Sequence, residues 1–344
     1  MAVSGSLAAK NGAPEARELR YRVGSSIPGH PTQQVSLLPK ARSDGFDLKS
    51  NGNTFQFVRT QGRPWTLPGP VKSYSFPDQA RTYYQNASFL SDLEASFEET
   101  MDRIFYLGPL RDYPQRDYLW ARSRPRDVGM KGEKAIDAIL AATTARETRN
   151  LKPKGHLKSF QEIIAFWLAE MGLISSFQVV EIAPGSNRWQ AKVQIRKDGP
   201  VALLTDVGFG VSQVLPVVTL LYYVPEYSTV ILEQPEIHLH PLAQARLADV
   251  IINVAQRRNV QVILESHSEH LLLRLQRRIA EDDVSASDVK LYFCHPSGTA
   301  TSASPLKLDL FGNIENWPQN FMGDAFGETV AAEKARLKRM TAAE

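Results

Sequence analysis

The segment STVILEQPEIHLHP, residues 228–241, decides the fold of this chain together with VQVILESHSEHLL, residues 260–272. Each segment begins with a short apolar run and passes directly into a carboxylate, Glu233 in the first and Glu265 in the second. The residues between the two runs, 241–256, have the apolar spacing of a helix. The pair of segments therefore predicts two strands joined by a crossover helix.

The same alternation continues toward the C-terminus, with a helical stretch at 268–280 and another apolar run at 289–293. Short apolar strands that alternate with helices predict right-handed β-α-β units and strands buried on both faces. We therefore expect an α/β fold with a mostly parallel sheet and flanking helices.

The residues before this core have a different pattern of apolar, proline and glycine residues. Proline and glycine interrupt short alternating stretches at 20–71, which predicts irregular antiparallel β-structure with its clearest strand at 55–60. A helix is expected from Phe89 to about Met101, then a short strand at 104–107, and further helices at 132–142 and 159–172. Ser159 and Glu162 form a capping-box pattern at the start of the last helix. A hairpin is expected at 176–196.

These changes in sequence pattern predict four regions along the chain. Residues 1–18 are rich in Ala, Gly and Ser and are expected to be a disordered tail. A β-rich and helical N-terminal region is expected at 19–150, the core α/β lobe at 151–294, and a small C-terminal domain at 295–344.

Composition excludes several classes of protein. The chain has 344 residues, of which 43% are hydrophobic and 22% charged, so a wholly disordered chain is excluded. Its net charge of +3 is too small to indicate nucleic-acid binding by itself. The single cysteine, Cys294, excludes an intramolecular disulfide and a four-cysteine zinc site. With no apolar run near the ~20 residues of a membrane helix and no secretory signal, we expect a cytoplasmic protein.

The carboxyl ends of the two predicted strands form the first candidate site. Ligands of open parallel sheets bind outside the carboxyl ends of strands, and magnesium is held by one or two carboxylates plus substrate phosphates. If the two strands are neighbours, Glu233 and His267 lie at one edge, where a histidine can act as a hydrogen-bonding sensor or a base. A single carboxylate at this position is also compatible with an ordinary solvated turn.

A second candidate site lies in LLTDVGFGVSQVLPVV, residues 203–218. Gly208 and Gly210 come immediately before an apolar helical run. Glycine-rich turns at helix N-termini bind anions because free backbone N–H groups and the helix dipole point the same way. Many such turns bind nothing, so this pattern indicates an anion site only in combination with the other segments of the chain.

These segments in this order resemble the C-terminal lobe of an ABC-type ATPase, most closely the SMC/RecF/OLD-like group of AAA-family ATPases of bacterial repair and phage-defence loci. DVGFGVSQVLPVV resembles their signature loop, TVILEQPEIHLHP their Walker B strand with the D-loop, and VILESHSEHLL their switch-histidine loop. FYLGPLRDYPQR and the later DLFGNIENWPQNFMGDAFGE resemble other parts of these proteins. The resemblance covers about residues 105–328.

The resemblance implies a partial P-loop ATPase fold and roles for particular residues. Glu233 takes the position that holds Mg²⁺, Gln234 the position of the catalytic carboxylate, and His267 that of the γ-phosphate sensor. The signature loop contacts ATP held by the opposite subunit of a head-to-tail dimer, and here it contains Gly208, Gly210, Ser212 and Gln213. The implied cofactors are ATP and Mg²⁺, and the implied partners are a second copy or another ATPase chain, with DNA as a further candidate and no membrane.

The sequence departs from the family pattern in two ways, and both limit what the resemblance implies about ATP hydrolysis. No G-x-x-x-x-G-K-S/T motif occurs in the chain, and the nearest Gly/Lys cluster, VGMKGEKA at 128–135, has the wrong spacing. We therefore expect a chain that lacks the N-terminal Walker A segment, is inactive alone, and hydrolyses ATP only when that segment is supplied. Gln234 also cannot act as a carboxylate base, although it could orient water. Glu236 is the alternative base.

Two further hypotheses stay open from sequence. The chain could be a non-catalytic pseudo-ATPase that serves as an interaction subunit. Alternatively, it could be a metal-dependent hydrolase, because His238 and His240 alternate on an extended segment near Glu233, Glu236 and His267. The alternative explanation for the two histidines is a cap on a strand-to-helix turn. A DNA-binding face is suggested by Arg257 and Arg258 with the arginines of 268–280, against an ordinary solvated helix face.

Overall fold

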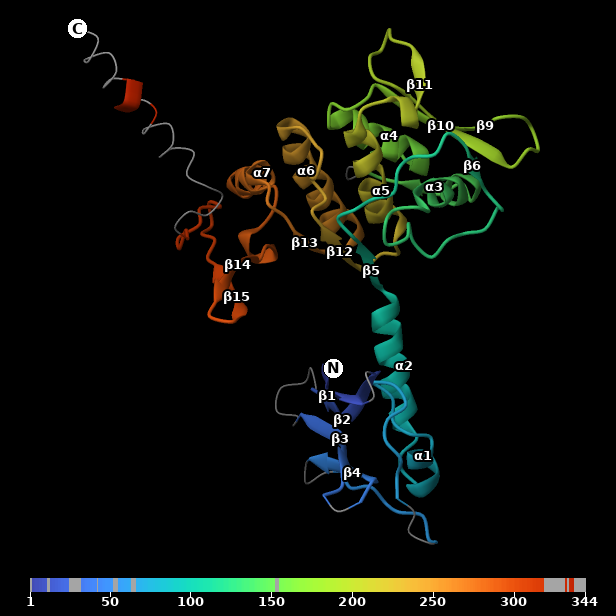
Figure 1. Ribbon diagram of the computed structural model, residues 1–344, viewed down its shortest axis with the longest axis vertical. Helices are drawn as coiled ribbons and strands as arrows, with labels where there is room; N and C mark the ends of the chain where they lie inside the picture. Colours follow the sequence, from blue (N-terminus) through green and yellow to red (C-terminus); the bar gives the residue numbers. More distant parts are fainter. Residues whose placement is uncertain are drawn as a thin grey trace. The chain divides into compact units, whose positions relative to one another are not determined.

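The sheet at the centre of the fold is parallel, as the strand–helix–strand pattern predicts. In the computed structural model β5 (Ile104–Leu107), β12 (Thr229–Glu233) and β13 (Gln261–Glu265) lie side by side in the order β13-β12-β5. Figure 1 shows these strands with helices near them. The structure describes residues 2–10, 13–24, 32–41, 43–51, 55–62, 66–151, 155–318, 332 and 334–336.

The chain divides into two compact units, Met1–Arg103 and Ile104–Glu344. This boundary differs from the expected one at residue 150. Helix α3 (Ala135–Thr144) packs on α4 (Phe160–Glu170) and α5 (Phe209–Tyr223), so residues on both sides of 150 share one core. The expected C-terminal domain at 295–344 lies largely outside the described residues from 319 onward.

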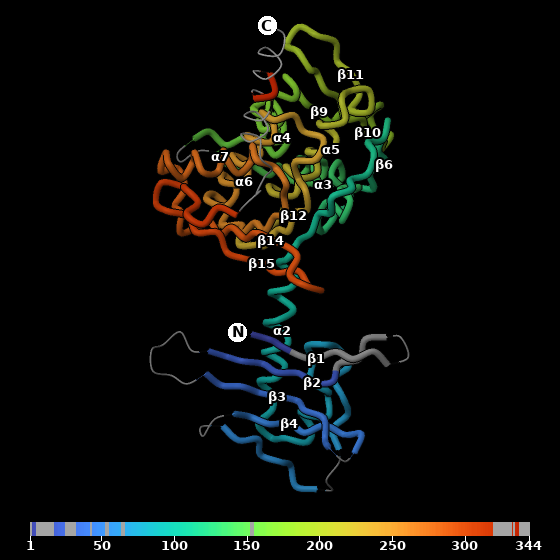
Figure 2. Tube along the Cα trace, turned by 60° about the vertical axis from the view of Figure 1, so that its left-hand side comes forward, coloured from blue at the N-terminus to red at the C-terminus, as the bar shows by residue number. Residues whose placement is uncertain are grey.

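The first unit is an antiparallel sheet with two helices against it (Figure 2). The strands follow in chain order: β1 (Ala2–Lys10), β2 (Ala13–Val23), β3 (Gln33–Pro39) and β4 (Phe46–Asn51). The expected disordered tail at 1–18 is therefore wrong for the described residues, because β1 and most of β2 fall there. Backbone hydrogen bonds hold this hairpin, and they need no side-chain periodicity.

The core of the first unit joins the sheet to α1 (Gln79–Tyr83) and α2 (Phe89–Asp102). Leu19, Tyr21 and Leu37 from the strands and Leu90 from α2 are fully buried. The strand expected at 55–60 is absent from the described residues, where only an isolated bridge joins Arg59 to Tyr84. The Asn86 side chain takes the hydrogen bonds that a strand would use, because it accepts from Val58 N and donates to Gln56 O.

Antiparallel β-structure in the second unit confirms the hairpin expected at 176–196. Strands β9 (Ser176–Glu181) and β10 (Arg188–Gln194) pair across a turn, and β10 also pairs with β11 (Val201–Leu203) and β6 (Tyr118–Leu119). Two short strands, β7 (Thr148–Arg149) and β8 (Lys158–Ser159), pair nearby. The run at 289–293 differs from expectation, because β14 (Leu291–Ser297) pairs antiparallel with β15 (Ala300–Leu306) and not with the parallel sheet.

The helices of the second unit form its core. Every residue of α5 from Val211 to Tyr223 is buried, as befits a helix packed between α3, α4 and α6 (Pro241–Arg258). The predicted capping box of α4 is confirmed, because Ser159 accepts from Glu162 N and Glu162 accepts from Ser159 N. Helix α7 (Glu269–Ala280) packs on α6. No helix in the described part of the chain is both long and apolar enough to cross a membrane.

Candidate nucleotide site at the strand tips

The carboxyl ends of β12 and β13 lie side by side, which confirms the predicted juxtaposition. Glu233 and Glu265 are partners in the parallel register. His267 follows β13, its side chain is 79% exposed, and its Nε2 lies 3.2 Å from Glu265 Oε1. The edge therefore carries two carboxylates and an accessible imidazole, the groups that a metal-phosphate ligand would meet.

Tyr106, from the neighbouring strand β5, contacts the same edge. Its hydroxyl is hydrogen-bonded to Glu233, and burial followed by this contact raises the pKa of Tyr106. A neutral hydroxyl at this position donates to the Glu233 carboxylate and fixes its orientation. This contact could not be predicted from the sequence, because it depends on β5 lying next to β12.

Arg111 is a residue of this site that the sequence reasoning did not single out. It is only 5% exposed, and its Nη1 and Nη2 donate to the carbonyl oxygens of Gln234 (2.9 Å) and Glu233 (3.0 Å). Burial lowers the pKa of Arg111, whereas the charge of Glu236 acts in the opposite direction. Arg111 thus fixes the position of the backbone segment that follows β12.

Glu236 is a buried carboxylate rather than an exposed one. It is 6% exposed, and its Oε1 accepts hydrogen bonds from Ser266 Oγ (2.7 Å) and His267 N (2.8 Å). Its Oε2 is buried with no hydrogen-bond partner among the described residues. Glu236 therefore connects the loop after β12 to the loop after β13 and positions the backbone of His267.

The loop after β12 contains two residues with left-handed backbone conformations. Gln234 has φ of +43° and His238 has φ of +64°. Left-handed conformations cost a residue with a Cβ about 1–2 kcal/mol, so the surrounding structure must impose them. For Gln234 it does so through hydrogen bonds at both ends of the residue, from its N–H to Glu265 O (2.9 Å) and from Arg111 to its carbonyl.

The N-terminus of α5 packs against this loop. The Phe209 ring lies edge-on to His238, 4.9 Å between centroids, and a Cβ on Gly210 would lie 3.0 Å from His238 O. Gly210 therefore permits the close approach of the two segments. Gly208 is exposed, and a Cβ there would meet nothing within 4 Å.

The other two residues expected in the signature loop lie inside the helical core. Ser212 is 6% exposed and donates to Phe209 O (2.8 Å). Gln213 is 2% exposed, and its Nε2 has no hydrogen-bond partner among the described residues. Of these four residues, Gly208 and Gly210 are the two that are not buried.

The histidine pair proposed as a metal chelate has a structural role. His240 is the N-cap of α6, because its Nδ1 accepts from Ala243 N (3.3 Å), and His238 packs on Phe209. Within the described ranges no group of three or more His, Cys, Asp and Glu residues could hold a metal ion. The metal-dependent hydrolase is therefore not supported, and the cap on a strand-to-helix turn is confirmed.

The basic cluster suggested for DNA is neutralised within the fold. Arg274 and Arg278 both form ion pairs with Asp249 on α6 (2.7 and 2.8 Å), and Arg277 pairs with Glu281. Arg258 is 5% exposed. Arg274 and Arg278 therefore join α7 to α6, whereas Arg277 pairs with Glu281 at the end of its own helix and Arg257 remains exposed.

This ion-pair network makes stability depend on pH. Burial alone would raise the pKa of Asp249, but the hydrogen bonds from Arg274 and Arg278 outweigh it and lower the pKa. Because the folded-state pKa is depressed, the stabilisation is present above the unfolded value of about 3.9 and is lost as pH falls through the folded value. We expect Asp249→Asn to lower the free energy of unfolding by about 2 kcal/mol near neutral pH.

Urea denaturation at neutral pH and at about pH 3 checks this expectation, because the difference between wild type and Asp249→Asn should shrink in acid. Glu98→Gln is the control, since the Glu98–Lys72 pair is exposed and should contribute much less to stability than the pairs of Asp249. A penalty for Asp249→Asn that is the same at both pH values would contradict the prediction.

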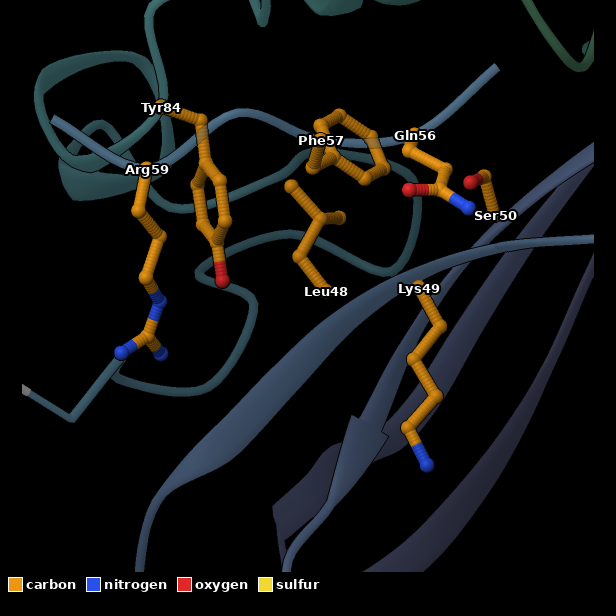
Figure 3. A pocket seen from close by; sticks show the side chains of 7 residues that line it. All are labelled: Leu48, Lys49, Ser50, Gln56, Phe57, Arg59 and Tyr84. Atoms are coloured by element: carbon orange, nitrogen blue, oxygen red, sulfur yellow. The ribbon is translucent and has the colours of Figure 1, made fainter. Parts of the chain in front are cut away.

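A shallow pocket in the first unit was also considered as a site. It has a volume of about 350 Å³ and lies beside β4. Figure 3 shows Arg59 beside Tyr84 at one end, with the guanidinium 5.7 Å from the ring centroid, and Lys49 at the other end pointing away from the aromatic rings. Among its described lining residues there is no acid, histidine or cysteine.

Comparison with known proteins gives the family. A model described as "AAA domain, putative AbiEii toxin, Type IV TA system" matches residues 66–274, and one described as "Protein of unknown function (DUF3696)" matches residues 284–331. A search of curated proteins found no significant match.

Solved structures give weaker likenesses, among them three to SMC proteins. A structure reported for ATP-driven dimerization and DNA-stimulated activation of SMC ATPases is 13% identical, with a TM-score of 0.34 over 43% of this chain and 84% of that chain. An Smc head from Pyrococcus furiosus bound to the C-terminal domain of ScpA is 11% identical, with a TM-score of 0.32 over 43% of this chain and 35% of that one.

An SmcHead bound to the C-winged helix domain of ScpA is 12% identical, with a TM-score of 0.41 over 87% of this chain and 77% of that chain. Likenesses at this level transfer no role to individual residues. The family rests instead on the sequence model, which spans more than half of the 344 residues. The chain belongs to the AAA-domain family of the putative AbiEii toxin, type IV toxin–antitoxin type.

Proposed function

We propose that this chain forms the magnesium-binding and γ-phosphate-sensing edge of an ATP site. The observation that carries the proposal is the pairing of Glu233 with Glu265 at the carboxyl ends of parallel strands, next to the exposed His267. In this proposal Glu233 holds the metal shell, Gln234 orients the attacking water, and His267 senses the γ-phosphate. Glu236 acts as a positioning residue for His267 rather than as a base, because it is buried.

No G-x-x-x-x-G-K-S/T motif occurs in the sequence, and in this proposal the phosphate loop of the site comes from another segment. No described strand pairs with the free edge of β13, and Ile263 on that strand is 51% exposed. An unpaired edge is a template for another strand. We infer that a strand bearing the phosphate loop pairs there, supplied by a partner ATPase chain.

ATP hydrolysis would then be Mg²⁺-assisted attack of water on the γ-phosphate. Gly208 and Gly210 expose backbone N–H groups at the start of α5, which suits contact with ATP held by a second, head-to-tail subunit. Cytoplasmic action in DNA repair or phage defence is the role that this chemistry would serve, with DNA as a partner. The supporting observation is the family to which the chain belongs.

Thermal melts of the chain together with a chain that supplies the phosphate loop, with and without millimolar MgATP, test the proposal. At about 100 times the dissociation constant a ligand stabilises by about 2.7 kcal/mol, which corresponds to roughly 5–10 °C for a unit of this size. We expect a rise in Tm for the wild type and little or none for Glu233→Gln, because the isosteric amide removes the charge that holds the metal. Glu170→Gln is the control, because that carboxylate is half-exposed and far along the chain on α4.

A wild-type melt that MgATP leaves unchanged would favour the second function, a non-catalytic interaction subunit. Equal shifts in wild type and Glu233→Gln would show that nucleotide binds elsewhere, and would remove Glu233 from the site.

A further inference from the structure

The loops that follow β12 and β13 are joined to each other by hydrogen bonds. We call residues 234–240 the first loop and residues 266–268, which include His267, the second loop. Glu236 of the first loop joins them on one side, because its Oε1 accepts from Ser266 Oγ and from His267 N. This contact fixes two of the three residues of the second loop.

Ser268 is the third residue of the second loop, and it is 4% exposed. Its backbone N–H donates to Ser266 Oγ (3.0 Å), and its own Oγ accepts from Leu271 N (3.1 Å) as the N-cap of α7. The hydroxyl proton is donated to Gln244 Oε1 (2.7 Å) on the first turn of α6. A serine hydroxyl has one proton to donate, so this bond commits Ser268 to Gln244.

Gln244 also bonds to the first loop. Its Nε2 donates to Leu239 O (2.9 Å), and Leu239 N donates in turn to the backbone oxygen of Glu236 (3.1 Å). An amide side chain both accepts and donates at neighbouring atoms, so Gln244 can hold one loop with each half of its amide. The result is a closed ring of hydrogen bonds through Glu236, Ser266, Ser268, Gln244 and Leu239.

The ring is largely shielded from water. Glu236 and Leu239 are each 6% exposed, and Ser268 is 4% exposed. Removing one partner of a buried hydrogen bond leaves the other unsatisfied, which costs more than losing the same bond in water. Neither loop can therefore shift without breaking bonds to the other.

The side chain of His267, in contrast, is held mainly through its backbone. It is 79% exposed, and its contact at 3.2 Å is with Glu265, which is itself 51% exposed. Contacts between exposed groups of this kind contribute little to holding a side chain in place. The position of the imidazole therefore depends on the second loop, and the second loop depends on the ring.

We propose that Gln244 is a positioning residue for His267. By bonding to both loops it fixes the place of His267 relative to Gln234, the residues to which the γ-phosphate and the attacking water are given above. The inference rests on the proposed ATP site, and it adds to that site a residue of α6 that acts through Ser268 and Leu239.

Hydrogen–deuterium exchange of the full chain, resolved to single amides, tests the positioning without nucleotide. In Gln244→Met the side chain keeps its length but can neither accept from Ser268 nor donate to Leu239. We expect the amide of His267 to exchange about 10-fold faster than in the wild type, because local opening of the loops becomes easier. The amide of Val193 in β10 should keep its rate. Unchanged exchange at His267, or the same acceleration at Val193, would contradict the proposal.

Gln244→Glu separates the two halves of the amide. A glutamate of the same shape still accepts from Ser268 but places an acceptor against the carbonyl oxygen of the first loop. The proposal requires both bonds, so exchange at His267 should be faster in this variant as well. Gln256→Met is the matched control, because Gln256 lies on the same helix and its Nε2 donates to a backbone carbonyl outside the ring. Wild-type exchange in Gln244→Glu, or faster exchange at His267 in Gln256→Met, would overturn the proposal.

Kinetics connect the positioning to hydrolysis. The chain is assembled with a chain that supplies the phosphate loop, and hydrolysis of MgATP is followed. We expect Gln244→Met to lower kcat about 10-fold with little change in KM, because a sensor of the γ-phosphate acts in the transition state. A raised KM with an unchanged kcat would count against the proposal. If the wild-type assembly hydrolyses no ATP, the proposed function fails, whereas faster exchange at His267 in Gln244→Met still supports the positioning.

Discussion

Arg111→Met is expected to lower the free energy of unfolding of the second unit by about 3 kcal/mol. The guanidinium is buried and donates to two carbonyl oxygens, and its charge faces that of Glu236. Methionine fills a similar volume but leaves both carbonyls without their donor and removes the positive charge near Glu236, and an unsatisfied buried group costs about 1–3 kcal/mol. For a unit of this size the Tm should fall by roughly 6–12 °C.

Urea denaturation of wild type and variant measures this change. Arg188→Met is the matched control, because Arg188 pairs with Asp117 at 2.7 Å but is 62% exposed, and its loss should change stability by less than about 1 kcal/mol. Adding Glu236→Gln to Arg111→Met should cost less than Glu236→Gln costs alone, since the buried negative charge has then already lost its partner. Strict additivity of the two substitutions would show that Arg111 and Glu236 do not interact.

Gly132→Ala is expected to destabilise the second unit by a similar amount, about 3 kcal/mol. Gly132 has φ of +77°, and a Cβ built there would lie 2.5 Å from Pro216 Cβ. Pro216 is in the buried middle of α5, so it cannot move away without disturbing the core. The substitution therefore adds a steric clash with the core to the cost of a left-handed alanine.

Gly185→Ala separates these two contributions. Gly185 has nearly the same φ, +79°, but a Cβ there would meet nothing within 4 Å. Its replacement should cost only about 1–2 kcal/mol, the backbone term alone. If the two variants melt at the same temperature, the approach of Gly132 to Pro216 is not close in solution.

The glycines of VGMKGEKA show how far a local pattern can be interpreted. From sequence they formed the nearest Gly/Lys cluster to a phosphate loop, with the wrong spacing. In the fold, Gly132 allows the loop that precedes α3 to pack closely on Pro216 of α5. The carbonyl oxygen of Met130 in the same loop accepts a hydrogen bond from Gly108 N. A tight turn and a phosphate loop both require glycine, so the residue type cannot distinguish them.

Periodicity and capping residues determined the local elements of this protein. The strands that end at Glu233 and Glu265, the helix between them, and the capping box of α4 all follow from interactions within a few residues, which a sequence displays directly. The sequence left open whether these two strands are neighbours, and the parallel register that pairs Glu233 with Glu265 shows that they are.

The partners of charged side chains were decided only by the tertiary structure. Arg111 reaches carbonyl oxygens more than a hundred residues away, Asp249 neutralises two arginines of α7, and Glu236 is buried rather than exposed. A charged residue has the same identity whether it faces water or a buried partner, and its environment is fixed by elements that pack together only once the chain has folded.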